Sequence, residues 1–300
     1  MAISFERDFL FPYDTVVSVA PRIRRLLARN PSPFTFKGTG VTIVGQGHVA
    51  VIDPGPDDPH HLSVLREALR NETVTHILVT HTHRDHSPAS RALQQWTGAK
   101  IYGFGPHGSG KAEEGIVIEE GGDMDFNPDV VVRDGDLIEG RDFSFECVHT
   151  PGHTSNHICY ALKEEKALFS GDHVMGWSTT VVAPPDGDMA QYMKSLEKLL
   201  ARDDVIYWPT HGGPIRDPQT FVRAYLEHRY ERETQIVGCL RDGISTIPEM
   251  VTRIYIGLDP SLRGAAALSV FAHLNKLTKE GRVITRGEPG LNTRFQLTQS

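Results

Sequence analysis

The sequence predicts an α/β fold followed by a smaller winged-helix-like domain. Three observations support this prediction. Short β-branched runs alternate with amphipathic segments over the first two thirds of the chain, polar motifs directly follow several of these runs, and the pattern changes to helices near Pro218. Apolar runs of strand length that alternate with helical spacing are typical of α/β domains. We therefore expect a first domain at residues 1–217 and a second at residues 218–300.

The composition is that of a folded chain. Hydrophobic residues make up 39% of the 300 residues, enough for one large core or for a large and a small one. The formal net charge of −7 disfavours a protein whose whole surface binds nucleic acid, because phosphates require a basic face. Residues 218–300 are nevertheless mildly basic, with 11 Lys and Arg against 8 Asp and Glu.

Cysteines and apolar runs indicate the compartment. Cys147, Cys159 and Cys239 are far apart and have no CxxC spacing, so we expect buried apolar side chains rather than disulfides or thiolate zinc ligands. The first residues contain no basic segment followed by an apolar run, and no stretch of about 18 apolar residues occurs. We expect a soluble, cytoplasmic protein that does not contact a membrane.

The first predicted elements lead to the most informative motif. Residues 34–53 have the pattern of two strands around Gly-rich turns, and residues 59–71 have apolar side chains at helical spacing. The run VTHILVT at residues 74–80 has the length and composition of a buried strand. A second helix is predicted at residues 87–96 and a further strand at residues 99–104. The segment HTHRDH lies between this buried strand and the second helix.

The same alternation continues through the middle of the chain. Residues 143–149 are predicted as a strand, residues 157–172 as a hairpin, residues 188–202 as a helix, and residues 205–213 as a strand that runs into a Gly-Gly turn. In the last third, three helices precede two strands joined by a Gly/Pro turn at residues 282–298. Three helices and a hairpin are typical of a winged-helix-like module.

Two glycine-rich matches are rejected as nucleotide sites. GFGPHG at residues 103–108 matches G-x-G-x-x-G, but glycines interrupt the helix that should begin there. GPHGSGKA at residues 105–112 nearly matches a phosphate-binding loop. It lacks the Ser or Thr that should follow Lys111 to hold magnesium, because Ala112 has no hydroxyl. We interpret this segment as a loop that lines a cleft.

The segment HTHRDH concentrates metal-ligating side chains. His81, His83, Asp85 and His86 lie within six residues, directly after a predicted strand. The pattern H-x-H-x-D-H is rare by chance in a chain of this composition.

Three further candidates are His153 in TPGHTS, Asp172 in FSGDHV and His211 in YWPTHGG. Each lies where a strand enters a Gly-containing loop, so the side chains can converge at one edge of a sandwich. A single loop histidine is usually solvated. The set together predicts a metal site, for which imidazole and carboxylate ligands favour zinc and tolerate iron or manganese.

These residues resemble the complete seven-ligand set of the metallo-beta-lactamase superfamily, in the usual chain order and over about residues 15–215. The resemblance implies an αββα sandwich, with two sheets face to face, helices outside and two divalent metal ions at one edge. It implies that His81, His83 and His153 hold the first ion. It also implies that Asp85, His86 and His211 hold the second and that Asp172 bridges both.

Such a site is suited to hydrolysis. Two divalent ions about 3.5 to 4 Å apart can share a bridging hydroxide whose proton is lost near neutral pH. Asp85 would act as the catalytic residue that orients this hydroxide and takes its proton. His157 and His173 are candidates for protonating the leaving group, although each also fits a supporting role beside a ligand. Asp53, in VIDPGP, resembles an aspartate that holds a metal-ligating histidine, and it also suits a turn.

Several segments narrow the reaction. RNPSPFTFKGTGVTIVG, SGDHVMGWSTTVV and the C-terminal segment that includes TIPEMVTRIY resemble the beta-lactamase-like protein 2 family, whose members are endoribonucleases that act on single-stranded RNA. This resemblance favours a phosphodiesterase or endoribonuclease. The alternatives are a thioester or carboxylic-ester hydrolase resembling glyoxalase II, which shares the ligand set, and a non-enzymatic winged-helix binding protein. Beta-lactam hydrolysis is disfavoured because the name-giving enzymes usually lack the bridging aspartate at position 172.

Substrate contacts are predicted at two places. Thr179 and Thr180 could donate hydrogen bonds to a phosphate or carboxylate, or be ordinary strand-edge threonines. Four cations of the C-terminal domain could contact a nucleic-acid backbone, or form a solvated helical face. These are Lys276, Lys279, Arg282 and Arg286.

No large inserted cap separates the ligands, so we expect substrate recognition by residues 103–123, residues 182–188 and the C-terminal domain. The substrate is then single-stranded RNA or a small ester or thioester. A homodimer is compatible with a winged helix at one end of the chain.

Overall fold

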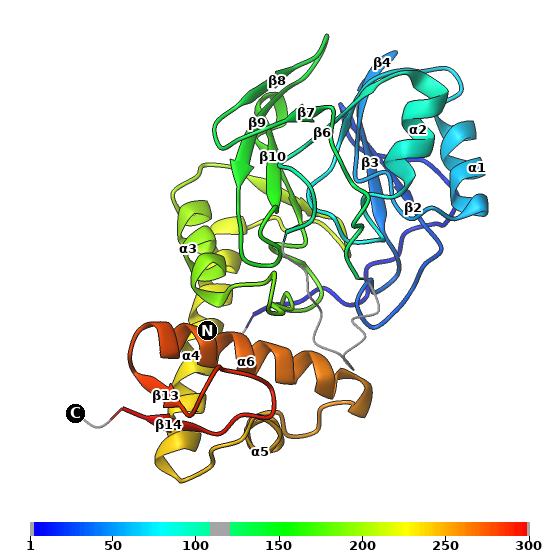
Figure 1. Cartoon of the computed structure of the whole chain (residues 1–300). Coiled ribbons are helices and arrows are strands. Elements are labelled where there is room, and N and C mark those ends of the chain that lie inside the picture. The colour runs from blue at the N-terminus through cyan, green and yellow to red at the C-terminus, as the bar shows by residue number, and fades with distance from the viewer. Residues whose placement is uncertain (1–2, 109–120, 299–300) are drawn as a thin grey trace.

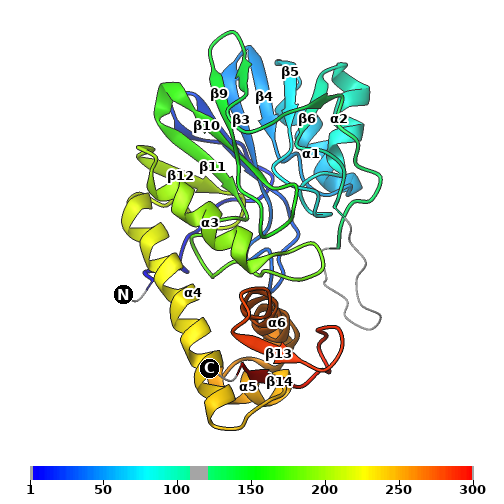
Figure 2. The same cartoon turned by 60° about the vertical axis from the view of Figure 1, so that its left-hand side comes forward.

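Two β-sheets face each other in the larger part of the molecule (Figures 1 and 2). The structure is a computed structural model that describes residues 3–108 and 121–298. The first sheet contains β1 (Val17–Ala20), β2 (Ile23–Leu27), β3 (Gly40–Gln46), β4 (His48–Ile52), β5 (Thr73–Leu78), β6 (Lys100–Gly103) and β7 (Val130–Val131), in this spatial order. Pairs from β1 to β4 are antiparallel and pairs from β4 to β7 are parallel.

The second sheet has the spatial order β12-β11-β10-β9-β8. Its strands are β8 (Leu137–Glu139), β9 (Ser144–His149), β10 (Ile158–Leu162), β11 (Ala167–Gly171) and β12 (Ile206–Pro209), and a 3₁₀ turn at Lys163–Glu165 joins β10 to β11. Only the β11–β12 pair is parallel. This parallel pair places the ends of β11 and β12 at the same edge of the sheet.

The main core lies between the two sheets. Ile52 and Leu78 of the first sheet belong to one buried cluster with Phe145, Ile158 and Phe169 of the second. Side chains alternate across each strand, so the opposite faces need their own cover.

Helices provide that cover. Helices α1 (Pro59–Ala68) and α2 (Ala89–Thr97) pack on the first sheet through Leu65 and Leu93. Helix α3 (Met189–Leu200) and the start of α4 (Pro218–Arg241) pack on the second. The αββα arrangement implied by the family resemblance is confirmed.

Three of these helices begin at an aspartate cap. The carboxylates of Asp58, Asp188 and Asp217 accept hydrogen bonds from backbone N–H groups in the first turns of α1, α3 and α4. Pro59 and Pro218 directly follow two of these caps, where the missing N–H has no intrahelical partner to lose. The predicted change of pattern at Pro218 therefore coincides with the start of a helix.

The remaining elements form a small C-terminal module at one end of the sandwich (Figures 1 and 2). They are α5 (Ile247–Ile254), a 3₁₀ turn at Pro260–Leu262, α6 (Arg263–Lys279), β13 (Val283–Thr285) and β14 (Phe295–Leu297). Their core includes Ile236 near the end of α4, whereas Val222 near its start packs on the sandwich. Because α4 belongs to both cores, the domain boundary after residue 217 stays a prediction.

Four strands are absent from the sequence prediction, namely β1, β2, β7 and β8. β1 and β2 lie around Pro21 in VSVAPRIRRLLA, where Pro21 and three arginines interrupt the apolar alternation. Arg25 of β2 is buried, and its guanidinium donates to the carbonyls of Pro209 and Thr210 at 2.8 and 3.2 Å. A buried arginine in a strand therefore supports the end of β12, directly before His211.

The three cysteines are free and buried, as predicted. Burial raises the pKa of the Cys147 and Cys159 thiols to about 12, which keeps them protonated and unreactive. Within the described residues, no helix has both the length and the apolar character needed to cross a lipid bilayer.

Candidate metal centre

The seven side chains predicted as metal ligands converge at one edge of the sandwich. The segment after β5 supplies four of them, and the loops after β9, β11 and β12 supply one each. In chain order they are His81, His83, Asp85, His86, His153, Asp172 and His211. Their ligand atoms form three overlapping groups, and within each group these atoms lie within 4.8 Å of one another. Loops at the ends of buried strands thus bring together residues that are up to 130 positions apart.

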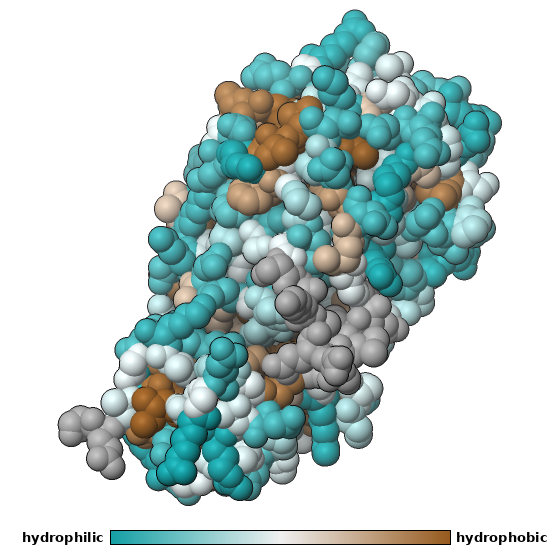
Figure 3. All heavy atoms as spheres, viewed as in Figure 1, coloured by the Kyte–Doolittle hydropathy of each residue, from teal (hydrophilic) through white to brown (hydrophobic). Residues whose placement is uncertain are grey.

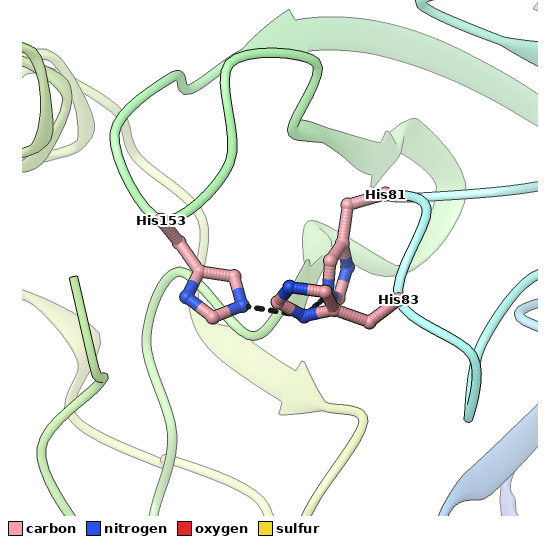
Figure 4. Close-up of side chains that lie close together, drawn as sticks. All are labelled: His81, His83 and His153. Atoms are coloured by element: carbon pink, nitrogen blue, oxygen red, sulfur yellow. Dashed lines mark hydrogen bonds between the residues drawn. The ribbon is translucent and has the colours of Figure 1, made fainter. Parts of the chain in front are cut away.

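Three histidines form the first group, and Figure 4 shows them pointing toward one another from two loops. His83 Nδ1 lies 2.9 Å from His81 Nε2 and 3.1 Å from His153 Nε2. Three ring nitrogens that face one point are the arrangement by which proteins hold a zinc ion while leaving a further position for water.

The second group joins a carboxylate to two histidines. Asp85 Oδ2 lies 3.1 Å from His86 Nε2 and 3.0 Å from His211 Nε2. Asp172 forms the remaining group with His81 and His86, and it lies between the other two groups. Its Oδ2 is 3.5 Å from His86 Nε2, 3.4 Å from His211 Nε2 and 4.0 Å from His153 Nε2. This placement suits a carboxylate shared by two neighbouring ions.

Several polar atoms of these side chains are buried without a hydrogen-bond partner. They are Asp85 Oδ1, His86 Nε2, Asp172 Oδ1 and His211 Nε2. Burying a polar atom without a partner is costly, so most such atoms in native proteins have one. Their convergence, with imidazole nitrogens beside carboxylate oxygens, fits divalent cations of the zinc, iron or manganese type.

Asp53 supports the second group from the side of the His86 ring that faces away from the cluster. Its Oδ2 accepts hydrogen bonds from His86 Nδ1 at 2.9 Å and from Thr210 Oγ1 at 2.8 Å, and its Oδ1 accepts the backbone N–H of Thr80 at 2.8 Å. A proton on Nδ1 leaves the lone pair of His86 Nε2 free to face the cluster. The predicted role of Asp53 agrees with these contacts. Its φ of 47° also places it in a left-handed turn conformation.

Backbone carbonyls orient two other ligands in the same way. His153 Nδ1 donates to the carbonyl of Val181 at 2.7 Å, and His211 Nδ1 donates to the carbonyl of Gly38 at 3.1 Å. In both rings Nε2 is therefore left to act as the ligand atom.

Burial and neighbouring charges determine the protonation of the cluster. Burial lowers the pKa of His81 and His83 well below its ordinary value, and the neighbouring histidines add to this effect. Burial also opposes a charge on His86 and His211, but the adjacent carboxylates outweigh it. They raise the pKa of His86 well above its ordinary value and that of His211 to about 10. Divalent cations would replace these protons, because a ligating imidazole must be neutral.

The two histidines considered as proton donors are not placed for that role. His157 is fully buried, and its Nε2 accepts the backbone N–H of Asp172 at 3.2 Å. Burial lowers its pKa well below the ordinary value, so this ring is neutral and positions Asp172. His173 is also fully buried, with its ring centroid 4.7 Å from that of Tyr192. Neither side chain lines the cavity beside the cluster.

The two threonines differ in their contacts. Thr179 lines the cavity and stays a candidate for substrate contact. Thr180 is buried, and its hydroxyl donates to the carbonyl of Asp172 at 2.7 Å. Since that hydroxyl has a backbone partner, Thr180 fits the structural alternative, in which it supports the Asp172 loop.

A cavity of about 490 Å³ lies beside the cluster. His83, His153 and Asp172 contribute to its wall, and most of the remaining lining is apolar. The apolar lining residues include Phe34, Met124, Met175, Trp177, Val181, Leu262, Leu268 and Phe271. By contrast, hydrophilic residues cover most of the outer face in Figure 3, where hydrophobic ones form small separate groups.

The loops predicted to recognise substrate contribute to this cavity in part. Ala183, Pro184, Pro185 and Asp186 line it from the loop before α3. His107, in the rejected GFGPHG match, also lines it, and its Nδ1 lies 2.7 Å from Thr82 Oγ1. The predicted loop also includes residues 109–120, which lie outside the described residues. The apolar lining was not predicted. A signal for it is present in the sequence, because the large apolar side chains of Met175 and Trp177 follow shortly after Asp172.

Two family models match the chain. The first, described as the metallo-beta-lactamase superfamily, matches residues 37–211. The second, described as a beta-lactamase associated winged helix domain, matches residues 246–290. The winged-helix character predicted for the C-terminal module is thereby confirmed.

Curated relatives cover most of the chain. An atrochrysone carboxyl ACP thioesterase of Claviceps purpurea is 30% identical over 290 residues, which are 93% of this chain and 87% of the relative. A beta-lactamase-like protein 2 homolog of Drosophila melanogaster is 32% identical over 287 residues, which are 89% of this chain and 91% of the relative.

Solved structures share the whole fold. A beta-lactamase domain protein from Burkholderia ambifaria has a TM-score of 0.78 at 20% identity and covers 97% of this chain and 96% of its own. A metallo-beta-lactamase family protein from Thermus thermophilus has a TM-score of 0.75 at 22% identity and covers 94% and 100%. Both likenesses include the C-terminal module, because they extend over nearly the full chain.

Proposed function

The chain belongs to the metallo-beta-lactamase superfamily and is a hydrolase, and on this premise we propose that it is a dinuclear metal enzyme that hydrolyses acyl thioesters. The sequence resemblance favours single-stranded RNA as the substrate and a thioester or ester as the alternative. The chemistry of the cavity instead favours a thioester over RNA.

The lining of the cavity carries the proposal. Among the described residues that line it, none is Lys or Arg, and the carboxylates are those of Asp172 and Asp186. Proteins bind nucleic-acid backbones by neutralising phosphates with Lys and Arg. An apolar wall beside a catalytic cluster instead suits an apolar acyl group, whose burial is favourable by about 25 cal/mol per Å².

The cations predicted to contact RNA have acidic partners within the protein. Lys276 Nζ lies 2.6 Å from Glu233 Oε2 and Lys279 Nζ lies 2.7 Å from Asp188 Oδ2. Arg282 pairs with Glu233 as well. Of the four predicted cations, these three already have their charge compensated, which weakens the electrostatic case for RNA.

The leaving group also favours a thioester. A thiolate is stable enough to leave without prior protonation, since thiols have pKa values near 8.5, whereas an alkoxide requires a proton donor. The two predicted donors, His157 and His173, are buried away from the cavity. Hydrolysis of a thioester therefore does not require a proton donor in this site, whereas cleavage of an ester or phosphodiester does.

The residues of the cluster have separate tasks in this reaction. His81, His83 and His153 would hold one ion, Asp85, His86 and His211 the other, and Asp172 would contact both. Divalent ions there would supply Lewis acidity, which lowers the pKa of water toward neutrality and stabilises charge on the substrate carbonyl oxygen. Asp85 Oδ2 accepts a hydrogen bond from Thr39 at 3.0 Å, while its Oδ1 has no hydrogen-bond partner. Oδ1 is therefore free to orient the attacking water and take its proton.

The relatives support the same choice. One curated relative is named an atrochrysone carboxyl ACP thioesterase, and it aligns with 93% of this chain. Acyl groups on carrier proteins and on coenzyme A are both thioesters, so acyl-coenzyme A compounds are suitable first substrates.

The test compares two substrate classes on the same preparation. Zinc-loaded wild type and Asp85→Ala would each be incubated with acyl-coenzyme A and with unstructured single-stranded RNA. Thiol release would be measured with a thiol reagent and RNA fragments on a denaturing gel. We expect thiol release by the wild type only, with intact RNA. RNA cleavage without thiol release would overturn the proposal in favour of the endoribonuclease.

A further inference from the structure

Helix α6 occupies an unusual place for the second helix of a helix-turn-helix. In DNA-binding winged helices this helix is exposed, because it enters the major groove. Here α6 has buried residues on every face, among them Val270, Leu274 and Leu277 in the core of the module and Ala272 in the cluster under the second sheet. Figures 1 and 2 show α6 between the sandwich and the β13–β14 hairpin.

The face of α6 toward the sandwich completes the wall of the cavity. Leu268 and Phe271 of α6, with Leu262 directly before it, line the same cavity as His83, His153 and Asp172. Side chains of the C-terminal module and metal-ligating side chains thus face a common space, although they lie at least 90 positions apart in the chain.

Phe271 also borders a second cavity of about 320 Å³. This second cavity is more polar, with Asn275 and Lys279 in its wall. Pro184, Pro185 and Phe271 line both cavities, so these three side chains form the partition between them. Removing the Phe271 ring would open the first cavity into the second.

We infer that the C-terminal module is the acyl-selecting element of this enzyme, and that Phe271 of α6 limits the length of the acyl group. This inference rests on the proposed thioesterase function. An apolar acyl chain would extend from the metal centre along Trp177 and Leu268 to the Phe271 ring. The module would therefore select substrates through its packing against the sandwich, and not by binding a nucleic acid.

The experiment measures kcat/KM for acetyl-, butyryl-, octanoyl- and palmitoyl-coenzyme A. We expect Phe271→Ala and Phe271→Leu to raise the ratio of palmitoyl to butyryl hydrolysis by about 10-fold or more, since a few methylenes are worth that much in an apolar pocket. Phe271→Trp should lower the ratio. Phe271→Leu guards against loss of folding, because Phe271 is also part of the core of the module; thermal melts would verify each variant.

Leu274→Ala is the matched control. Leu274 is fully buried in the same core, one turn further along α6, and is not among the residues that line either cavity. Its variant should lose stability but keep the wild-type ratio. Binding of S-hexadecyl-coenzyme A, a thioether that cannot be hydrolysed, provides a second readout through tryptophan fluorescence, because Trp177 lines the cavity. It should bind more weakly to Phe271→Trp than to Leu274→Ala.

The outcomes separate the two proposals. If the wild type hydrolyses thioesters and all Phe271 variants keep its chain-length ratio, the inference about α6 is wrong and the proposed function stands. If the wild type hydrolyses none of the four thioesters, the proposed function fails and the inference fails with it.

Discussion

Hydrogen bonds on the outer side of each ring decide which nitrogen of a ligating histidine faces the metal centre. Asp53 does so for His86, and main-chain carbonyls do so for His153 and His211. These contacts leave the nitrogens that face the metal centre available as ligand atoms.

Asp53→Ala should weaken metal binding without removing a ligand. The substitution frees Nδ1 of His86 and removes the acceptor for Thr80 and Thr210, so we expect an affinity loss of about 10- to 100-fold. Competition with a chromophoric chelator measures this affinity. Asp203→Ala is the control, since Asp203 is 87% exposed and pairs with Lys166 at the surface. Equal affinities in both variants would contradict the assigned role of Asp53.

Removing ligands should have graded effects on metal content. His83→Ala should lose the ion of the first group, whereas Asp172→Ala should lower the occupancy of both, because Asp172 lies near both groups. Each should reduce kcat/KM by at least about 100-fold, more than the loss typical of a supporting residue. Metal analysis after gel filtration provides the stoichiometry. Full activity with less than two ions per chain would contradict a dinuclear centre.

At the scale of elements, α4 joins the two parts of the molecule. Its first half packs on the second sheet through Val222 and Tyr225, and its second half enters the C-terminal core through Ile236. Near its middle, Glu233 is buried and pairs with Lys276 of α6 and with Arg282 next to β13. A single carboxylate thus links three elements of the module.

Glu233→Ala should destabilise the C-terminal module. The change leaves Lys276, which is 12% exposed, with Glu280 as its remaining acidic partner. We expect a loss of about 1–3 kcal/mol in the free energy of unfolding, less than for a fully buried pair because Arg282 is half exposed. Urea denaturation of this variant and of Glu231→Ala, an exposed position on the same helix, measures the difference. Equal midpoints would show that the Glu233 pairs contribute nothing.

A partly buried histidine of α4, His228, should make the protein sensitive to acid. Burial, with Arg229 and Arg232 nearby, lowers the pKa of His228 from 6.5 to about 3. The unfolded chain binds a proton below pH 6.5 and the folded chain does not, so this stabilising contribution is complete above pH 6.5 and is lost as the pH falls toward 3. Acidification from about pH 7.5 to about pH 5 should therefore lower the free energy of unfolding by about 2 kcal/mol.

Unfolding of His228→Gln at these two pH values tests this effect. The variant should lose about 2 kcal/mol less than the wild type on acidification. His60→Gln, at an exposed position in α1, should behave like the wild type. An unchanged pH dependence in His228→Gln would contradict a lowered pKa of His228.

At the scale of the whole molecule, the metal centre connects both sheets. Its ligands follow β5 of the first sheet and β9, β11 and β12 of the second. Ions bound there would cross-link the two halves of the sandwich and stabilise the native state relative to the unfolded chain.

Chelation should therefore lower the melting temperature. Free metal at 1,000 times its Kd stabilises by about 4 kcal/mol, and for a chain of this size each kcal/mol corresponds to roughly 2–4 °C. We expect Tm to fall by roughly 10 °C with a chelator and to recover on addition of zinc. Asp172→Ala should respond much less. A wild-type Tm that is insensitive to chelator would argue against metal binding at this edge.

The sequence by itself determined the metal-ligand candidates and most of the elements. HTHRDH directly follows a buried strand, and His153, Asp172 and His211 each follow another, so the end of a strand predicts where each side chain lies. Such signals are local, because one strand and its turn contain them. The sequence did not predict the first hairpin, because the burial of its Arg25 depends on carbonyls near residue 210, which lie far away in the chain.

Only the tertiary structure decided what surrounds the metal centre. Phe34, Trp177 and Phe271 come from three distant segments, and only packing brings them to one cavity. Likewise, Lys276 and Lys279 have the same charge whether solvated or paired, and folding alone brings Glu233 and Asp188 to them. Substrate chemistry depends on side chains that converge through packing. The sequence therefore predicted the hydrolytic centre, and the packing of α6 against the sandwich determined the apolar space beside it.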